Sequence, residues 1–179
     1  MRNRQLSRIA LANALILVFA VGVAKAADIP DAWVTIKTKI SLMTTEGIST
    51  KDLNVDTVNG VVTLHGKVAT EAERAKAETV ARGIEGVKEV KNLLQVVPTA
   101  QRAVVQRSDD AIKKSVEAAF KANRRVNTSG INVASVNKGV VLLSGKTKSL
   151  EAYLESVEVA NAVRGVRRVS TEVEVVPAS

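Results

Sequence analysis

Apolar and polar residues follow one another along this 179-residue chain in a pattern that occurs twice. VNGVVTLHGK, at residues 58–67, returns as VNKGVVLLSGK at residues 136–146. The match runs from Asn54 and Asn132 to the Val-Val-Pro runs that end at Pro98 and Pro177. The offset is 78 residues before Lys138 and 79 after it. A period this long indicates two copies of a small domain, because solenoid units usually have ~20–50 residues.

Each copy predicts helix, strand, strand, helix and strand in that order. The first helices are expected to begin near Asp31 and near Ser108-Asp109, residue types that cap helix N-termini. The second helices are expected to begin at Thr70 and Ser149, and glycines at 86 and 165 suit their ends. A third strand is expected over residues 90–97 and again over residues 169–175, where apolar residues alternate.

The first two strands of each copy should form an antiparallel hairpin. Asn59-Gly60 suits a two-residue type I′ turn. In the second copy we expect a three-residue loop, Asn137-Lys138-Gly139, whose glycine occupies the left-handed position of a G1 bulge and so absorbs the extra residue. The six-residue spacing of the glycine pairs brackets a strand, which favours a structural role over a phosphate loop. These structural turn glycines are Gly60, Gly66, Gly139 and Gly145.

The predicted fold class is α+β, because one side of each small sheet is apolar and two helices are available to cover it. We expect two tandem αββαβ modules, each a three-stranded mixed sheet with two helices on one face. The modules should span residues 27–98 and 109–179, joined by a linker at 99–108. Val104 and Val105 in that linker indicate a packed connector.

Residues 1–26 have the pattern of a signal peptide: a basic start, an apolar run from Ile9 to Ala24, and the small-x-small site Ala24-Lys25-Ala26. An uncleaved membrane anchor is the alternative, since the run is only slightly shorter than the roughly 18 residues of a spanning helix. The Ala-Lys-Ala site favours cleavage. No cysteine follows the run, which argues against lipoprotein anchoring. The prediction is a periplasmic protein exported by a cleavable signal peptide.

The composition excludes some classes of binding partner. The chain has no cysteine, so hydrophobic burial has to stabilise it without disulfides. Four of the eight formal net positive charges lie at Arg2, Arg4, Arg8 and Lys25. The remaining positive charge is modest and aromatic residues make up 2%, so a nucleic-acid partner is not expected. We also expect no small-molecule substrate and no cofactor, and a monomer.

Candidate catalytic residues are scarce. His65 is the single histidine, and it alternates with Val62 and Leu64, which places it on the other side of its strand, as a solvated residue. Its counterpart in the second copy is Ser144. Metal-ligand spacing is absent, and no nucleophile elbow, phosphate loop or paired buried carboxylate is evident. The sequence therefore predicts no catalytic residue, no metal site and no enzymatic activity.

The repeated residues resemble the BON family of bacterial envelope domains. The resemblance is carried by Val58, Asn59, Gly60, Val62, Leu64, Gly66, Gly86, Val87 and Val90, and by their counterparts in the second copy. It implies a non-enzymatic envelope or osmotic-stress protein built from αββαβ modules. It also implies binding to phospholipid surfaces or to nonpolar polypeptide segments.

A lipid-binding surface is expected on the first helix of the second copy. Lys114, Lys121 and Arg125 follow at intervals of seven and four residues, with Arg124 beside them, so one helical stripe would face anionic headgroups. Glu117 interrupts this patch. An ordinary solvated helix face is the alternative. On the first interpretation the partner is an anionic phospholipid surface.

A periplasmic chaperone that binds unfolded envelope proteins is the alternative function. It requires an exposed apolar strip, for which the candidates are Leu93, Val97, Val104, Val105 and Leu142. The same residues would serve equally well to pack the two modules against each other, which small domains benefit from.

Overall fold

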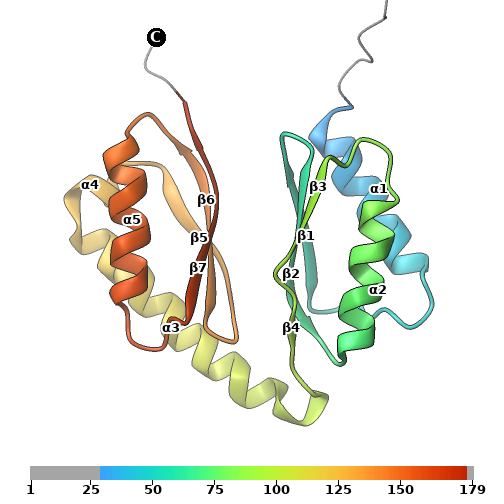
Figure 1. Cartoon of the computed structure of the whole chain (residues 1–179). Helices are drawn as coiled ribbons and strands as arrows, with labels where there is room; N and C mark the ends of the chain where they lie inside the picture. The colour runs from blue at the N-terminus through green and yellow to red at the C-terminus, as the bar shows by residue number, and fades with distance from the viewer. Residues whose placement is uncertain (1–28, 177–179) are drawn as a thin grey trace, which may run out of the picture.

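The computed structural model describes residues 29–176, which form two modules of similar architecture (Figure 1). The first module contains α1 (Asp31–Thr44), β1 (Leu53–Val58), β2 (Val61–Val68), α2 (Glu71–Arg82), β3 (Glu89–Asn92) and β4 (Gln95–Val96). A short 3-10 turn, η1 (Thr99–Gln101), leads into the second module. That module contains α3 (Arg102–Ala122), α4 (Arg124–Asn127), β5 (Ile131–Asn137), β6 (Val140–Thr147), α5 (Leu150–Ala162) and β7 (Arg168–Val175).

Each module has a mixed sheet with helices on one face, as the sequence predicts. β2 lies between antiparallel β1 and parallel β3, and β6 lies between antiparallel β5 and parallel β7. Val62 and Val141 are fully buried in the two helix-covered cores. The inward side chains of α1, among them Val34 and Leu42, are buried as well. The expected α+β fold with two αββαβ modules is therefore confirmed.

The third strand of the first module is divided, whereas a single strand was expected. β3 and β4 both pair with β2, and residues 93–94 interrupt them. The Asn92 side-chain oxygen accepts a hydrogen bond from the Leu94 backbone N–H, at 3.2 Å. This local contact competes with the strand ladder, as asparagine side chains commonly do. In the second module Thr171 replaces Asn92, and β7 is continuous.

Both hairpins have two-residue turns, so the predicted three-residue loop at 137–139 is wrong. Lys138 and Gly139 have φ values of 50° and 75°, close to the 53° and 79° of Asn59 and Gly60. Asn137 pairs with Val140 in the ladder, and the register shifts between Val133 and Ser135. The extra residue is therefore accommodated at Ala134 as a β-bulge.

One aspartate in each module explains why the turns are alike. Asp31 accepts hydrogen bonds from the backbone N–H groups of Asn59 and Gly60, at 2.7 Å each. Asp109 accepts them from Lys138 and Gly139, at 2.9 and 3.0 Å. In both modules the carboxylate accepts from the two central residues of a two-residue turn, which favours this turn length. The inserted residue is accommodated in the strand instead.

The predicted linker is helical, and α3 begins at Arg102 instead of near Ser108. No glycine or proline lies between residues 102 and 122 to stop the helix. Asp109, expected as a cap, lies inside α3 and caps the hairpin turn instead. The helix start is fixed to the first module by the Arg102–Asp52 ion pair, at 2.6 Å.

The two sheets face each other, and the helices lie on the two outer sides of the molecule (Figure 1). Val97 and Leu142 are both 1% exposed although neither belongs to a helix-covered core. Leu93 and Val105 are half-buried. Of the residues expected for an exposed apolar strip, Val104 alone is largely exposed. The interpretation that the modules pack together is the one the structure supports.

The predicted signal peptide lies outside the described residues. Within residues 29–176, none of the helices is both long enough and apolar enough to span a bilayer.

Candidate functional site

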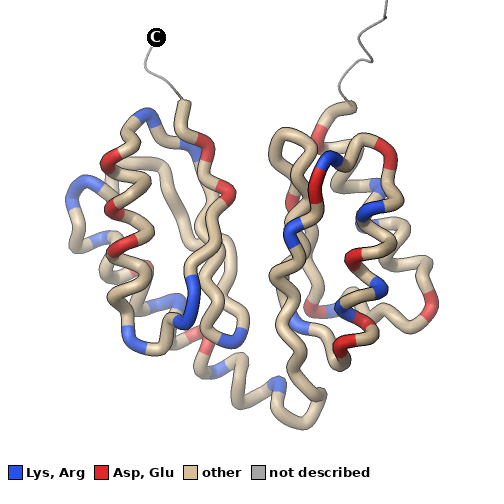
Figure 2. The backbone as a smooth tube through the Cα atoms, viewed as in Figure 1, with Lys and Arg blue, Asp and Glu red and all other residues tan. Residues whose placement is uncertain are grey.

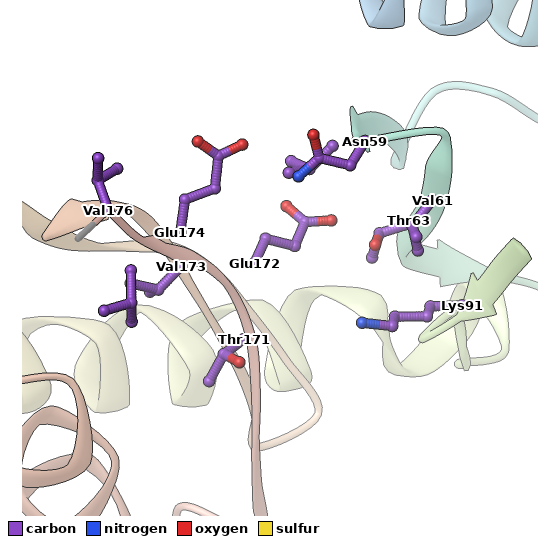
Figure 3. Close-up of a pocket in the computed structure, with 11 residues that line it drawn as sticks. Asn59, Val61, Thr63, Lys91, Thr171, Glu172, Val173, Glu174 and Val176 are labelled. Atoms are coloured by element: carbon purple, nitrogen blue, oxygen red, sulfur yellow. The ribbon is translucent and has the colours of Figure 1, made fainter. Parts of the chain in front are cut away.

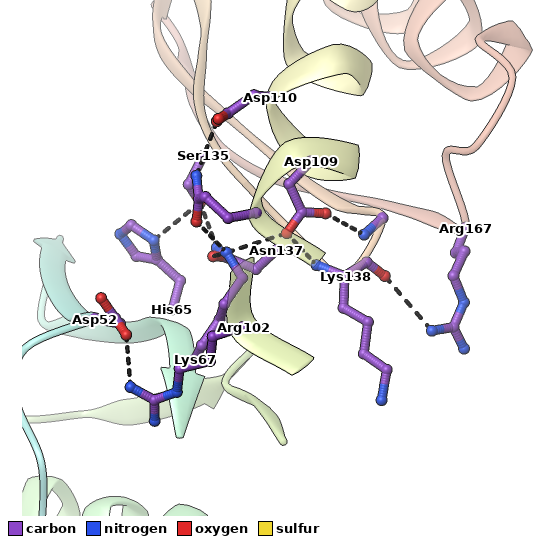
Figure 4. Close-up of polar contacts among 12 residues, drawn as sticks. Asp52, His65, Lys67, Arg102, Asp109, Asp110, Ser135, Asn137, Lys138 and Arg167 are labelled. Carbon is purple, nitrogen blue, oxygen red and sulfur yellow. Dashed lines mark hydrogen bonds and ion pairs between the residues drawn. The ribbon is translucent and has the colours of Figure 1, made fainter. Parts of the chain in front are cut away.

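A buried polar seam joins the two sheets (Figure 4). Lys67 of β2 forms an ion pair with Asp109 of α3 at 3.1 Å, and their side chains are 5% and 2% exposed. The Lys67 ammonium also donates to Gln106 at 2.9 Å and to Asn137 at 3.4 Å. Because the charges are paired and hydrogen-bonded on both sides, the burial is tolerated. Lys67 thus connects the first module to the capped turn of the second.

His65 belongs to this seam, so the expectation that it is solvated is wrong. Its side chain is buried, with Asp56 at 2.8 Å from Nε2 and the Ser135 hydroxyl at 2.9 Å from Nδ1. The hydrogen bond from His65 holds the pKa of Asp56 below its usual value. The second sheet covers the strand face that the sequence assigns to solvent. Both ring nitrogens have structural partners here.

A cleft of about 550 Å³ opens between the sheets beside this seam (Figure 3). Glu172 points into it from β7, toward Thr63 of β2, and Lys91 points in from β3. Burial, reinforced by the nearby Asp56 carboxylate, raises the pKa of Glu172. The neighbouring Thr63 hydroxyl acts in the opposite direction and offsets part of this increase in the pKa. Glu174 instead forms an ion pair with Lys146, at 2.8 Å.

The cleft does not assemble a metal-binding set. Between residues 29 and 176 no group of three or more aspartate, glutamate or histidine side chains is placed to hold a metal ion.

The glycines of the hairpins have backbone roles. Gly60 and Gly139 adopt the positive φ values of the turns. A side chain at Gly66 would meet the backbone oxygen of Asp52, and one at Gly145 would meet that of Gly130. These close approaches bring the start of the first strand against the end of the second.

The outward face of α3 is cationic. Lys114 and Lys121 are exposed on it, opposite the buried residues Ile112, Val116 and Phe120. Arg107 lies seven residues before Lys114 and is exposed too. We refer to Arg107, Lys114 and Lys121 as the α3 cationic face; basic segments recur along α3 and α4 (Figure 2). None of the three forms an ion pair within the part of the chain that is described.

Arg124 and Arg125 lie in α4 and do not continue the stripe, contrary to the prediction. Asn123 leaves the helical conformation and caps α4, accepting from the Arg125 and Val126 N–H groups. The Arg125 guanidinium pairs with Glu155 of α5 at 2.6 Å, while Arg124 is exposed. Hydrogen bonds from Asn123 and Arg125 hold the pKa of Glu155 below its usual value. The break at Asn123 turns these arginines out of the α3 register.

Arg107 was missed because it was assigned to the linker. The seven-residue period that relates Lys114 to Lys121 extends back to it, so the signal is present in the sequence. Acidic side chains limit the charge of this face. Asp110 and Glu117 lie along one border, and Glu117 pairs with Lys113 at 3.9 Å.

Two αββαβ units, packed sheet to sheet and linked by a continuous helix, define a tandem-module α+β protein. The chain belongs to the BON domain family, whose pattern matches residues 30–98 and 108–177. It is 32% identical over 145 residues to the osmotically-inducible protein Y of Escherichia coli, covering 80% of this chain and 72% of that protein. It is 31% identical over 117 residues to the outer membrane lipoprotein DolP of Haemophilus influenzae, covering 65% of this chain and 59% of that protein.

Among solved structures, the chain is similar to CdsD, a structural protein of the type III secretion system of Chlamydia trachomatis. The match covers 80% of this chain and 92% of that one, with 12% identity and a TM-score of 0.34. This similarity is too distant to support a functional comparison.

Proposed function

We propose that this is a non-enzymatic, exported periplasmic protein with an envelope or osmotic-stress role, and that it binds anionic phospholipid surfaces. The observation that carries the lipid proposal is the α3 cationic face, Arg107, Lys114 and Lys121, exposed along one side of a 21-residue helix. The stress and envelope role rests on the similarity to an osmotically inducible protein and to an outer membrane lipoprotein.

The charge of this face supports weak and salt-sensitive attachment. Each cation near an anionic surface contributes ~1 kcal/mol, so three cations would contribute ~3 kcal/mol at low salt. Asp110 and Glu117 on the border reduce that value. Salt weakens such contacts because the Debye length falls to ~8 Å at physiological ionic strength. Attachment of this strength is reversible.

Vesicle sedimentation tests the proposal. The protein would be purified from the periplasm of an expressing bacterium, with its N-terminus determined by mass spectrometry, which also tests processing near Ala27. Binding to phosphatidylglycerol-containing vesicles should weaken as salt increases, and Lys114→Glu with Lys121→Glu should reduce it by about tenfold or more. Lys51→Glu with Lys148→Glu makes the same change in net charge at exposed positions away from α3 and should bind more tightly than that variant.

The proposal fails if the wild-type protein does not sediment with anionic vesicles at low salt. It fails also if both double variants bind equally, since the position of the cations would then not matter.

A periplasmic chaperone that binds nonpolar segments of envelope proteins is the second candidate. Val97 and Leu142 do not support it, because they are buried between the modules. Exposed apolar side chains do occur on α1, where Trp33, Ile36, Ile40 and Met43 are largely uncovered. Suppression of the aggregation of an unfolded envelope protein, independent of salt, would favour this function.

A further inference from the structure

A second cleft between the modules is lined mainly by cations. It measures about 410 Å³, and arginine and lysine side chains line it from both modules. The first module contributes Arg74 of α2, beside the β4 segment that ends at Val96. The second contributes Lys138 from its hairpin turn, and Arg167 and Arg168 from the start of β7. We refer to this space as the cationic cleft and to its four basic residues as the interface cations.

Arg74 has a hydrogen-bond donor without an acceptor. Its Nη1 atom pairs with Glu71 at 3.3 Å, and Glu71 alone is acidic among the described residues that line the cationic cleft. The Nε atom of Arg74 is buried and has no hydrogen-bond partner among the described residues. A buried donor without an acceptor costs free energy. An acceptor supplied by a bound ligand would remove that cost.

The three cations of the second module form no ion pair within residues 29–176. Lys138 Nζ donates to the backbone oxygen of Val96 at 3.2 Å, across the interface. Arg167 Nη1 donates to the backbone oxygen of Lys138 at 3.5 Å, and Arg168 is exposed. The side chains of Lys138 and Arg167 extend in the same direction (Figure 4). Like charges gathered around one cleft repel each other, and an anion between them would reverse this effect.

The fold does not require four cations at these positions. The counterparts in the other module are Tyr153 for Arg74, Asn59 for Lys138, Lys88 for Arg167 and Glu89 for Arg168. The same architecture is therefore built there with one cation and one acid. Positive charges that packing does not demand, gathered around a concave surface, indicate an anionic ligand.

We propose that the cationic cleft binds a small, multiply charged oxyanion of the phosphate class between the two modules. Arginine suits this ligand, because its planar guanidinium can donate two N–H bonds to phosphate oxygens. The volume of the cleft lies within the ~300–1,000 Å³ that is usual for small-molecule sites. The anion would be a bound ligand and not a substrate.

This inference goes beyond the proposed lipid binding. None of the residues of the α3 cationic face lines the cationic cleft. A flat leaflet contacts the outer surface of the protein, whereas the interface cations surround a space between two packed modules. The concave shape favours a small soluble anion over a membrane surface.

A bound anion would connect the modules, because the interface cations come from both of them. A ligand that binds the folded arrangement alone raises its stability as the ligand concentration increases. Pyrophosphate should therefore raise the midpoint of thermal unfolding, and sodium chloride at the same ionic strength should raise it less.

Isothermal titration calorimetry with inorganic pyrophosphate, at constant ionic strength, tests the site in the purified protein. Saturable binding of one anion per chain is expected. Arg74→Gln and Arg168→Gln should each lower the affinity by about tenfold or more, since each removes a charge-assisted hydrogen bond. The matched control is Arg164→Gln, which removes an exposed arginine that does not line the cleft and should leave the affinity unchanged. Circular dichroism would establish that the three variants are folded.

Each contrary outcome overturns the proposal in a different way. If pyrophosphate shows no saturable binding to the wild-type protein, the cleft is not a site for small anions. An equal loss in Arg164→Gln would mean that net charge and not the cleft attracts the anion. A loss in Arg168→Gln without one in Arg74→Gln would place the anion on the second module alone.

Two further probes identify another occupant. If polyglutamate binds through the interface cations and pyrophosphate does not, the cleft is a site for acidic polypeptide. If phosphatidylglycerol vesicles bind through them and pyrophosphate does not, the ligand is a lipid headgroup. The vesicle test of the α3 cationic face changes Lys114 and Lys121, so the two proposals succeed or fail separately.

Discussion

At the scale of single residues, the surroundings of Glu172 change its ionisation. It projects into the cleft between the sheets, and burial is the main reason its pKa is raised. A raised carboxyl pKa means that the folded protein binds the proton more tightly than the unfolded chain does. The free energy of unfolding therefore falls as pH rises from the unfolded pKa of about 4.3 to the higher folded pKa.

Glu172→Gln should make the protein more stable at pH 7, because the amide removes the cost of a partly buried charge. The gain should disappear below about pH 4, where the wild-type carboxyl is also neutral. The charged and titratable groups near Glu172 are Asp56, His65 and Lys91. They are unchanged in the variant, so the difference in stability reports on residue 172. Urea unfolding at pH 7 and at pH 4 measures the difference.

Glu174→Gln is the control for this prediction. Glu174 lies two residues further along β7 and pairs with Lys146, so its replacement should give no gain at pH 7. An equal gain in both variants, or a Glu172→Gln gain that is the same at both pH values, would contradict the assignment to burial.

Residue environments were the least predictable part of this protein from sequence. Alternation correctly places Val62 and Leu64 in a core, because it depends only on the period of one strand. The same alternation assigns His65 to solvent, whereas His65 and Lys67, on the same face of the strand, are both buried. Whether the second face of a strand is exposed to solvent depends on what packs against it. Here the other sheet packs against it, through residues about 70 positions away in sequence.

At the scale of elements, the second hairpin shows how an inserted residue is located by a distant contact. Asp109 holds the N–H groups of Lys138 and Gly139, which keeps the turn at two residues and leaves the bulge at Ala134. Local turn preferences favoured a three-residue loop equally well. The deciding contact comes from α3, which no local pattern includes.

Deletion of Ala134 or of Lys138 tests where the inserted residue is accommodated. Removal of Ala134 should restore a regular ladder like that of β1 and β2, with a cost within about 1 kcal/mol. Removal of Lys138 leaves an Asn-Gly turn and shifts residues 135 and 136 by one position, so Val136 leaves the core. That deletion should cost about 2 kcal/mol more. Urea unfolding of the two variants compares them. Equal stability would place the insertion at the turn after all.

Some helix boundaries follow from local sequence, and others depend on distant contacts. The start of α2 is predictable because Thr70 accepts a hydrogen bond from the Glu73 N–H, a local contact that the sequence signals. Ser149 likewise caps α5. The start of α3 was not predicted from local sequence. Arg102 at this start forms an ion pair with Asp52 of the other module.

At the scale of the whole molecule, the Lys67–Asp109 ion pair joins the modules and should be sensitive to mutation. Lys67→Met removes the positive charge and leaves Asp109 buried with two backbone donors alone. We expect a loss of about 3 kcal/mol in the free energy of unfolding. The second module should also become more susceptible to separate unfolding, which thermal unfolding followed by circular dichroism would show as a broadened transition.

Lys146→Met is the matched control, since Lys146 occupies the equivalent position of β6. Its side chain is 73% exposed and pairs with Glu174 on the surface. This substitution should change the stability little. Comparable losses in the two variants would mean that the pair does not hold the modules together.

The sequence by itself determined the repeat, the order of elements, the helix-covered core of each module and the family. These depend on short-range periodicity, which each module carries independently of the other. The tertiary structure decided which strand faces are buried between the sheets and where the inserted residue lies. It also decided which cations are exposed together on one face of α3. Those features depend on contacts between residues far apart in sequence, and the burial of Lys67, His65 and Leu142 arises only when one sheet covers the other.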